Sequence, residues 1–460
     1  MFLLVVGLTA PAASATSPSN WTAFLHGPRH SSWNPAATAI TPANAGNLVR
    51  VLHWQDPAPL QGEPDAGLFA SPIVRNGVVY IGSNTGHFYA LDEITGNVLW
   101  NRFLGNTGSH TCRNKGITST ATVAPDASRG GQLTVYVGGG DGYLYALRAS
   151  DGQTVWSAPI NVPTPGVNDR YNWSSPTVAN GHVYMGISSQ CDDPLTQGGV
   201  RSVDQATGNV LATWYSVPDG QVGGSVWSSV AATPKAVFVT TGNGPGDSFS
   251  VVRLDPGTLQ KKDAWQVPGL AGSDIDFGAS PTLFTATING HAVGMVAAIS
   301  KNTHIYALRQ NRLSQGPVWQ FDQHRGHCNK SGDAGAVAGA IWDGTTLYAA
   351  DGGTTINGTC SLGEIRAFDP STGHVLWETP LGGKVFGTPT IDGAGVIGAA
   401  TFDGRAPNAE YLIDASDGTI LNTIGLDAPA FPQAVFADSY VFAATSSGDL
   451  ASFTPIVPSP

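Results

Sequence analysis

The chain alternates short stretches of β-branched and aromatic residues with polar, glycine-rich turns. Stretches such as "GVVYIGS" (77–83), "LTVYVGGG" (133–140) and "AVFVTTG" (236–242) are rich in residues that favour strands. Alternation with a period of two residues in such stretches predicts β-strands. Long amphipathic helical patterns are absent from the sequence. The pattern therefore predicts an all-β protein.

One strand-turn-strand unit recurs along the chain. The stretch "YALDEITGNVLW" (89–100) is followed by five similar units, and the six copies end at Trp100, Trp156, Trp214, Trp265, Trp319 and Trp377. A weaker copy at 412–421 lacks the tryptophan. Successive tryptophans lie 51 to 58 residues apart, a length that fits four short strands and three turns.

Repeats of this length pack around a central axis, because one four-stranded sheet cannot bury its apolar faces alone. Seven units are complete or nearly complete, and strands at 430–455 can form an eighth with a strand at 48–54. We therefore expect an eight-bladed β-propeller of four-stranded antiparallel blades, closed by its N- and C-terminal strands. The single domain would cover 44–456, with a lead-in at 16–43 and a tail at 457–460. The tryptophans are expected to pack between blades.

Charge and the N-terminal sequence narrow the possible functions. The formal net charge is -11 and no basic run is present, which argues against nucleic acid as a partner. An apolar stretch from Phe2 to Leu8, followed by Ala13-Ser14-Ala15, predicts a signal peptide over 1–15. The protein is thus expected to be exported to the periplasm, the cell envelope or the medium. No later stretch reaches the ~18 apolar residues that a transmembrane segment needs.

The four cysteines suit two disulfides in an oxidising compartment. They are Cys112, Cys191, Cys328 and Cys360, each in a polar loop. Proximity in the sequence pairs Cys112 with Cys191 and Cys328 with Cys360, although three connectivities are formally possible. No C-x-x-C-H motif occurs, so no covalently attached c-type haem is expected.

The repeated A-x-D-x-x-T-G-x-x-x-W unit resembles the tryptophan-docking motif of eight-bladed quinoprotein propellers. These form the superfamily of alcohol dehydrogenases that depend on pyrroloquinoline quinone (PQQ). The stretch at 21–54 is also similar to the lead-in of polyvinyl-alcohol-dehydrogenase-like members. The resemblance implies the fold more strongly than the cofactor, since cofactor-free relatives, including the outer-membrane assembly scaffold, share the repeat.

Three segments outside the repeat resemble the family's catalytic segments. "TTGNG" resembles the metal-binding segment, which implies that Asn243 binds a catalytic calcium ion. "SDIDFG" implies that Asp276 is the catalytic base and also lies at the metal, and "SKNTHIYAL" puts Lys301 where the family has an arginine or lysine. Lanthanide-type members carry another aspartate two residues after the base. Gly278 occupies that position here and favours calcium.

Two further segments match the family less closely. In "TCRNKGIT", Lys115 replaces an arginine that contacts the quinone. Cys112 falls where the family has two adjacent active-site cysteines, which implies that it contacts the cofactor. The metal-binding glutamate of the family falls in a loop whose nearest carboxylates are Asp192 and Asp193. We take Asp193 as the predicted ligand, because a shorter aspartate can still coordinate calcium.

The predicted residues supply the chemical groups that PQQ requires. PQQ is a flat tricarboxylate, so its site needs cations, a stacking surface and a hard metal with oxygen ligands. Lys115 and Lys301 supply positive charge, and Trp227 or Trp173 supplies an aromatic surface. Ordinary structural roles compete with these assignments, because aspartate and asparagine are common in turns and lysines are commonly solvated.

Two functions of different classes follow. The first is an exported PQQ- and calcium-dependent dehydrogenase that oxidises a small-molecule or polymeric alcohol and passes electrons to a separate acceptor. In this function Asp276 takes the proton of the alcohol. The alternative is a non-catalytic propeller that serves as a protein- or polysaccharide-binding scaffold. The lone Cys112 and the shortened metal-binding carboxylate favour the alternative.

Overall fold

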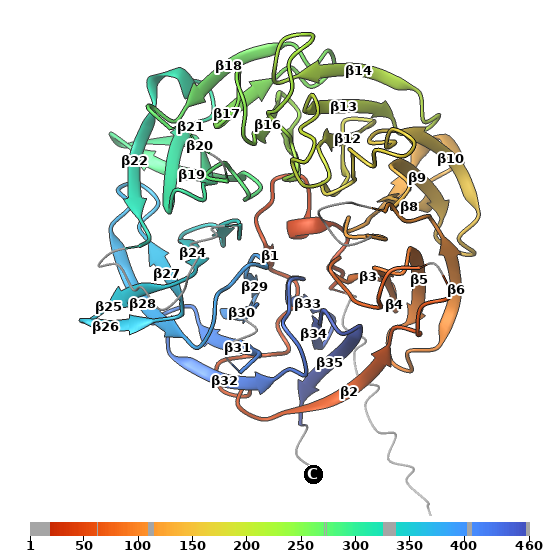
Figure 1. The fold of residues 1–460 in the computed structure, drawn as a ribbon. Helices are drawn as coiled ribbons and strands as arrows, with labels where there is room; N and C mark the ends of the chain where they lie inside the picture. Colours follow the sequence, from red (N-terminus) through yellow and green to blue (C-terminus); the bar gives the residue numbers. More distant parts are fainter. Residues whose placement is uncertain are drawn as a thin grey trace, which may run out of the picture.

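The computed structural model describes residues 19–61, 63–108, 115–270, 272, 274–324, 337–402 and 407–456. Within them the strands form a ring of blades around a central axis, with each blade's first strand nearest the axis (Figure 1). The predicted signal peptide lies outside the described residues. No helix of the described residues is both long enough and apolar enough to cross a membrane.

The first five blades each contain four consecutive antiparallel strands. Blades one and two comprise β3 (Ile73–Arg75), β4 (Val78–Gly82), β5 (His87–Asp92), β6 (Val98–Phe103), β7 (Thr122–Asp126), β8 (Gln132–Gly138), β9 (Tyr143–Arg148) and β10 (Thr154–Pro159). Blades three to five comprise β11 (Thr177–Ala179), β12 (His182–Ile187), β13 (Gly199–Asp204), β14 (Val210–Tyr215), β15 (Ala231–Thr233), β16 (Ala236–Thr240), β17 (Ser250–Leu254), β18 (Lys261–Gln266), β19 (Thr282–Ile288), β20 (His291–Ile299), β21 (His304–Arg309) and β22 (Pro317–Asp322).

The last three blades carry additions to this plan. Blade six comprises β23 (Ile341–Trp342), β24 (Leu347–Asp351), β27 (Gly363–Phe368) and β28 (Val375–Leu381), with an inserted hairpin of β25 (Thr354–Ile356) and β26 (Thr359–Ser361). Blades seven and eight comprise β29 (Thr390–Asp392), β30 (Val396–Ala400), β31 (Ala409–Asp414), β32 (Ile420–Gly425), β33 (Val435–Ala437), β34 (Tyr440–Ala444), β35 (Asp449–Pro455) and β2 (Leu48–Gln55). Three short 3₁₀ helices are η1 (Phe24–His26), η2 (Ala127–Arg129) and η3 (Leu313–Gln315).

The eighth blade closes the ring with strands from both ends of the chain. β2 pairs antiparallel with β35, so that Trp54 lies opposite Leu450. This pairing removes the free edge that an open ring of sheets would leave. The predicted eight-bladed, all-β propeller and its closure are confirmed.

The repeated tryptophans lie between blades, as the sequence predicts. The indole N–H of Trp100 in blade one donates to the backbone oxygen of Ala149 in blade two over 2.9 Å. Gly152, in the turn of blade two, has a φ of +66°, and a Cβ there would lie 2.4 Å from the Trp100 ring. Gly208, Gly373 and Gly418 lie in the same way against Trp156, Trp319 and Trp377, so these glycines provide both the left-handed backbone and the space for the neighbouring indole. In the turn of blade four the left-handed residue is Leu259.

A segment of the predicted lead-in runs through the centre of the ring. We call residues 19–34 the plug. Its backbone carbonyls accept hydrogen bonds from first-strand residues of blades two, four, five, six and seven and from the residue that follows the first strand of blade eight, and it also pairs with blade one. The partners are Val74, Val123, Ala232, Leu283, Trp342, Ile391 and Asp438. The plug contains η1 and ends in β1 (Trp33–Asn34), which pairs in parallel with β29. Figure 1 shows this segment, in red, inside the ring.

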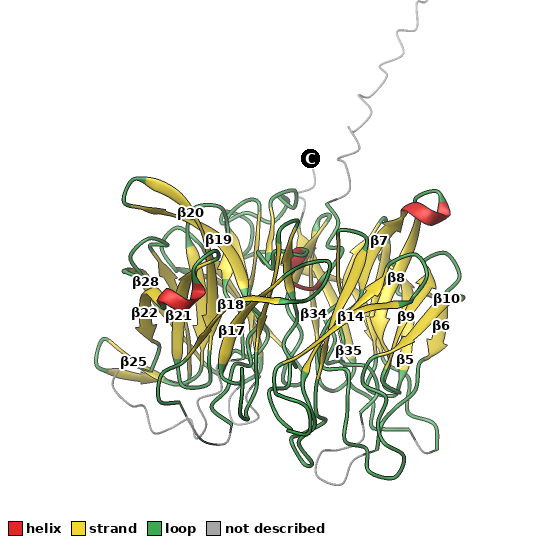
Figure 2. Cartoon of the chain, turned by 90° about the horizontal axis from the view of Figure 1, so that it is seen from above, coloured by secondary structure: helices red, strands yellow, loops and turns green. Residues whose placement is uncertain are grey.

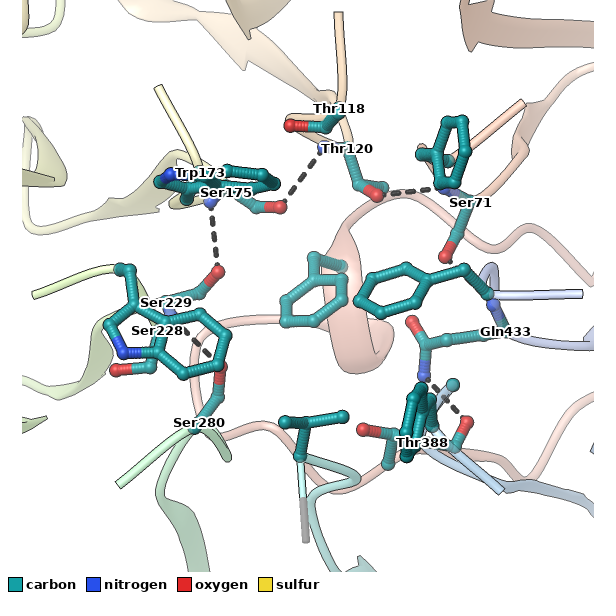
Figure 3. Close-up of a pocket in the computed structure, with 18 of the residues that line it drawn as sticks. Ser71, Thr118, Thr120, Trp173, Ser175, Ser228, Ser229, Ser280, Thr388 and Gln433 are labelled. Carbon is teal, nitrogen blue, oxygen red and sulfur yellow. Dashed lines mark hydrogen bonds between the residues drawn. The ribbon is translucent and has the colours of Figure 1, made fainter. Parts of the chain in front are cut away.

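A chain of hydrogen bonds links the blades around the axis. In six of the eight blades the backbone N–H before the first strand donates to a side-chain hydroxyl of the next blade, over distances of 2.7 to 3.0 Å; the hydroxyls belong to Ser71, Thr120, Ser175, Ser229, Ser280 and Thr388. We call these six residues the hydroxyl ring, and Figure 3 shows its members around the central cavity. In blade six, Gly339 holds the corresponding position and has no side chain to contribute. Gln433 holds the corresponding position in blade eight and carries an amide in place of a hydroxyl.

The connections between blades and the loops between second and third strands emerge on one face of the ring. In Figure 2 this is the lower face, on which the β25–β26 hairpin lies, while the C-terminal end lies on the opposite face. Because these two kinds of loop share a face, residues distant in the sequence can converge there. The candidate site is built from them.

Candidate functional site

Two adjoining cavities lie at the loop face. One, which we call the polar cavity, is about 370 Å³ and is lined mainly by polar and charged residues, among them Asp192, Asn243 and Asp276. The other, which we call the apolar cavity, is about 300 Å³; its surface is mostly apolar, and members of the hydroxyl ring also line it. Trp173, Trp227 and Lys301 line both cavities. Volumes of this size are typical of small-molecule sites.

Asp276 lies in the connection that leads into β19, where its backbone is fixed. Its carbonyl accepts a hydrogen bond from the backbone N–H of Lys301 over 2.8 Å and one from the Ser300 hydroxyl over 3.3 Å. The residue is only 2% exposed. The indole N–H of Trp227 donates to its carboxylate Oδ2 over 2.9 Å. This carboxylate is therefore held in a defined orientation at the boundary of the two cavities.

Lys301 follows β20 and brings a positive charge to the same place. Its Nζ lies 2.9 Å from Oδ1 of Asp276, forms a second ion pair with Asp274, and lies 4.7 Å from the centre of the Trp227 ring. Burial lowers the pKa of Lys301, but the charges and hydrogen bonds of Asp276 and Asp274 outweigh it, and the net effect is a raised pKa. The side chain is thus held as an ammonium group.

Asn243 and Asp192 form the far wall of the polar cavity. The Asn243 amide donates to Oδ2 of Asp192 over 3.0 Å, and its oxygen accepts the backbone N–H of Asp274 over 3.1 Å. Burial raises the pKa of Asp192, the hydrogen bond from Asn243 opposes this, and the charge of Asp276 reinforces it. Asp193, which the sequence predicts as the ligand, does not line the cavity. The geometry favours its neighbour Asp192.

Lys115 approaches the site from the connection between blades one and two. Its Nζ lies 4.8 Å from the centre of the Phe69 ring and 5.7 Å from that of Trp173. The Trp173 indole is itself fixed by an N–H donated to the backbone oxygen of Gln190 over 2.8 Å. Both predicted lysines therefore lie beside aromatic rings, an arrangement in which cation–π attraction contributes.

The structure leaves the cysteine predictions open. No cysteine among the described residues is free. Cys112 and Cys328 lie outside the described residues, so the pairings Cys112 with Cys191 and Cys328 with Cys360 stay predictions. The same applies to a contact between Cys112 and a cofactor.

Comparison with known proteins identifies the family. Residues 52–227, 120–258 and 301–456 match the PQQ_2 family, which is described as outer membrane protein assembly factor BamB. The chain belongs to the PQQ_2 family. The suspected relation to PQQ-like propellers is thereby confirmed.

Several relatives of this PQQ_2 chain are quinoprotein dehydrogenases. The dehydrogenase subunit of the quinone-type alcohol dehydrogenase of Gluconacetobacter polyoxogenes is 25% identical over 63% of this chain and 44% of its own length. Quinohemoprotein alcohol dehydrogenase ADH IIB of Pseudomonas putida is 27% identical over 53% of this chain and 40% of its own length. The chain thus spans less than half the length of these relatives. Polyvinylalcohol dehydrogenase of a Pseudomonas species is 22% identical over 91% of this chain and 78% of its own length.

Solved structures share the fold of this PQQ_2 chain. Quinohemoprotein alcohol dehydrogenase ADHIIG from Pseudomonas putida superposes with a TM-score of 0.75 at 17% identity, over 96% of this chain and 82% of its own. BamB from Moraxella catarrhalis gives a TM-score of 0.57 at 14% identity, over 88% of this chain and 99% of its own. Both an oxidoreductase and an assembly factor are therefore built on this propeller, and the fold alone does not select between them.

The polar cavity contains the groups that a PQQ site requires. The two indoles and the Lys301 ammonium group that line it suit a flat, anionic aromatic molecule, and the Lys115 ammonium group lies beside the Trp173 ring. The carboxylate of Asp192 and the amide oxygen of Asn243 are donors that calcium accepts. Among the described residues no group of three or more His, Cys, Asp or Glu side chains could hold a metal ion by itself. A calcium ion would therefore need further donors, and the carbonyl and carboxylate groups of a bound quinone are of the right kind.

The apolar cavity is a feature that the sequence analysis missed. Its lining includes Phe24 from the plug together with Phe69, Phe386 and Phe431 from three separate connections. None of these phenylalanines belongs to the repeated unit, so the repeat gives no indication that they converge. The only available signal was that Phe69, Phe386 and Phe431 each lie shortly before a first strand, on the same face as Trp227.

Proposed function

We propose that the protein is a PQQ- and calcium-dependent alcohol dehydrogenase that passes electrons to a separate acceptor. The observation that carries the proposal is the convergence of Asp276, Trp227 and Lys301 at the boundary of the two cavities. An aspartate that only accepts backbone hydrogen bonds in a turn needs neither burial nor an ion pair nor an indole donor, and Asp276 has all three. The similarity to quinoprotein alcohol dehydrogenases supports the same chemistry.

Each residue of the site has a role in this proposal. Asp276 is the catalytic base: it accepts the proton of the alcohol hydroxyl while Trp227 and Lys301 hold its two oxygens. Bound PQQ, with calcium as a Lewis acid, would supply the acceptor for the hydride that leaves the alcohol carbon. Lys301 and Lys115 would balance the negative charges of the cofactor.

The metal would lie against Asn243 and Asp192 in this proposal, with Asp276 nearby. Gly278 supports calcium over a lanthanide. A Cβ at Gly278 would lie 2.7 Å from the Trp227 ring and 2.7 Å from Val337. A third carboxylate at this position would therefore displace the indole that holds Asp276, so this chain has no room for the lanthanide-type ligand.

Export belongs to the proposal as well. The apolar stretch and the Ala13-Ser14-Ala15 site support cleavage after residue 15. Two disulfides would suit the oxidising compartment that export reaches. Sequencing the N-terminus of the protein recovered from its native host tests the cleavage, and an intact Met1 would contradict it.

The direct test is titration of the purified protein with PQQ, with and without calcium, followed by a dye-linked alcohol assay. We expect calcium-dependent, saturable binding at micromolar PQQ and alcohol-dependent dye reduction. An absence of PQQ binding at these concentrations would contradict the proposal. It would favour the scaffold alternative, which has support of its own in the description of the PQQ_2 family as an assembly factor.

A further inference from the structure

Four phenylalanines pack in a row beside the central cavity, and three of them, Phe69, Phe386 and Phe431, line it. The ring centres of Phe69 and Phe431 lie 6.4 Å apart, those of Phe431 and Phe402 5.7 Å, and those of Phe402 and Phe386 5.3 Å. All four are half-buried. We call these four residues the aromatic wall. Each comes from a different loop of blades six to eight and one, so the wall is assembled only by the tertiary fold.

The aromatic wall lies opposite the proposed base. Phe431 precedes β33 of blade eight, and Trp227 precedes β15 of blade four, which are diametrically opposite in a ring of eight. Phe69, Phe386 and Phe431 line the same cavity as Trp227 and Lys301. An alcohol with its hydroxyl at Asp276 therefore has the wall in front of its substituent.

The plug closes the cavity at the end away from the loop face. Phe24 of η1 lines it, and the Leu25 backbone N–H donates to the side chain of Gln433 over 3.2 Å, which ties the plug to blade eight. A substituent that enters from the loop face therefore meets aromatic carbon at the side and at the bottom. This shape suits a substituent of limited length.

The charge of the lining distinguishes this cavity from a cofactor site. Of the described residues that line it, Lys301 alone is charged, and it lies on the side of Trp227. Lys115 does not line the cavity, but its Nζ lies 4.8 Å from the Phe69 ring, at one end of the wall. A tricarboxylate placed against Phe386 and Phe431 would have carboxylates facing apolar carbon, which is costly without a compensating partner. A hydrocarbon or aryl group has no hydrogen bonds to lose there, and its transfer from water to the cavity is favourable.

We propose that the aromatic wall binds the apolar substituent of the alcohol and selects alkyl and aryl alcohols over polyols. The inference rests on the proposed function, since it takes the reacting hydroxyl to be at Asp276. It assigns to the wall the uncharged part of the substrate. A polyol chain would instead have to give up hydrogen bonds to water against the three phenylalanines of the wall that line the cavity.

The expected signature is a dependence of kcat/KM on chain length. Burial of each methylene should raise kcat/KM by about four-fold along the straight-chain alcohols until the cavity is filled. Glycerol and polyvinyl alcohol should be poor substrates beside 1-pentanol and benzyl alcohol. A flat dependence on chain length, or a preference for the polyols, would overturn the inference.

A matched pair of substitutions locates the effect. Phe386→Ser in the wall should lower kcat/KM for 1-pentanol and benzyl alcohol by about ten-fold, with a smaller loss for ethanol and unchanged PQQ affinity. Phe386→Leu keeps an apolar side chain and should lose mainly the preference for benzyl alcohol. Phe103→Ser changes an exposed phenylalanine on β6 and serves as the control that leaves selectivity unchanged. A loss of PQQ affinity in Phe386→Ser would assign the wall to the cofactor and overturn the inference.

The same alcohols separate failure of the inference from failure of the proposed function. If no alcohol is oxidised although PQQ binds, the proposed activity is wrong. Binding of 1-pentanol, benzyl alcohol and glycerol, followed by ligand-observed NMR, then tests the wall alone. Binding that favours the apolar alcohols and weakens in Phe386→Ser supports the wall; equal binding of all three contradicts it.

Discussion

The indole N–H of Trp227 donates to Oδ2 of the Asp276 carboxylate over 2.9 Å. Lys301 holds the other oxygen of that carboxylate at 2.9 Å. The three side chains come from three different loops, two of which lead into first strands and one of which joins a second strand to a third. The propeller thus fixes the direction in which the carboxylate can accept a proton.

Removing the indole donor should impair turnover more than binding. Trp227→Phe keeps an aromatic ring beside Lys301 but leaves Oδ2 of Asp276 without this partner, so we expect kcat to fall by about ten-fold with little change in PQQ affinity. Steady-state kinetics at saturating PQQ measure the effect. Trp100→Phe removes a similar hydrogen bond between blades and should lower thermal stability while kcat of the folded enzyme is kept. Equal kcat values for Trp227→Phe and the wild type would contradict the positioning role.

Calcium affinity should depend on Asp192 and not on its neighbour. Asp192→Asn removes one negative charge beside Asn243, and we expect the calcium needed for half-maximal PQQ binding to rise by roughly ten-fold or more. Because the pKa of Asp192 is raised, calcium should also bind more weakly as the pH falls. Asp193→Asn is the matched control and should behave as the wild type. If Asp193→Asn weakens calcium binding and Asp192→Asn does not, Asp193 is the ligand, as the sequence predicts.

The sequence carries the fold more completely than the site. The repeated turn and tryptophan specify blades of one length, and the alternating strands between them complete the propeller, because each is a local pattern. Asp276, Lys301, Trp227 and Asn243 could be proposed together because the segments that carry them resemble the catalytic segments of quinoprotein dehydrogenases. In the propeller, two of them precede a first strand and two follow a second strand. Such positions meet on one face of a propeller.

The remaining features depend on contacts that no local pattern encodes. The plug reaches Gln433 from Leu25, across 408 residues of sequence. The aromatic wall combines single phenylalanines from separate loops. The choice between Asp192 and Asp193 depends on the path of an irregular loop, where one residue of register decides which carboxylate faces Asn243.

A buried carboxylate outside the site should make stability depend on pH. Glu410 in β31 is 0% exposed, neither of its carboxylate oxygens has a hydrogen-bond partner, and burial raises its pKa to about 8 from 4.5. Between these two values the unfolded chain releases the proton while the folded protein keeps it, so stability falls as the pH rises. The loss should approach about 1.4 kcal/mol per pH unit.

Glu410→Gln removes this titration. Relative to the wild type, the variant should gain thermal stability progressively between pH 5 and pH 8, as measured by scanning calorimetry at a fixed scan rate. Asp219→Asn, at an exposed position, is the control and should follow the wild type. Parallel pH profiles for Glu410→Gln and the wild type would show that Glu410 does not carry the effect.

The hydroxyl ring should accept a seventh hydroxyl at Gly339. A Cβ there would lie 3.3 Å from the backbone oxygen of Ser280 and 3.3 Å from Oγ1 of Thr388, so the neighbours need to move by only a few tenths of an ångström. Gly339→Ser places a hydroxyl where it can accept a hydrogen bond from the backbone N–H of Ser280. We therefore expect the serine variant to be about 1 kcal/mol more stable than Gly339→Ala. Urea unfolding of the two variants measures the difference. A serine variant no more stable than the alanine variant would show that the added hydroxyl contributes nothing to the free energy of unfolding.

The most direct test of the account is the rate of alcohol oxidation by Asp276→Asn at saturating PQQ and calcium. The asparagine keeps the shape and the bond from Trp227 but cannot take the proton of the alcohol. We predict that PQQ still binds, while kcat falls by about a hundred-fold or more. Full turnover by this variant, in the presence of bound PQQ, would contradict the assignment of Asp276 as the base and with it the central claim.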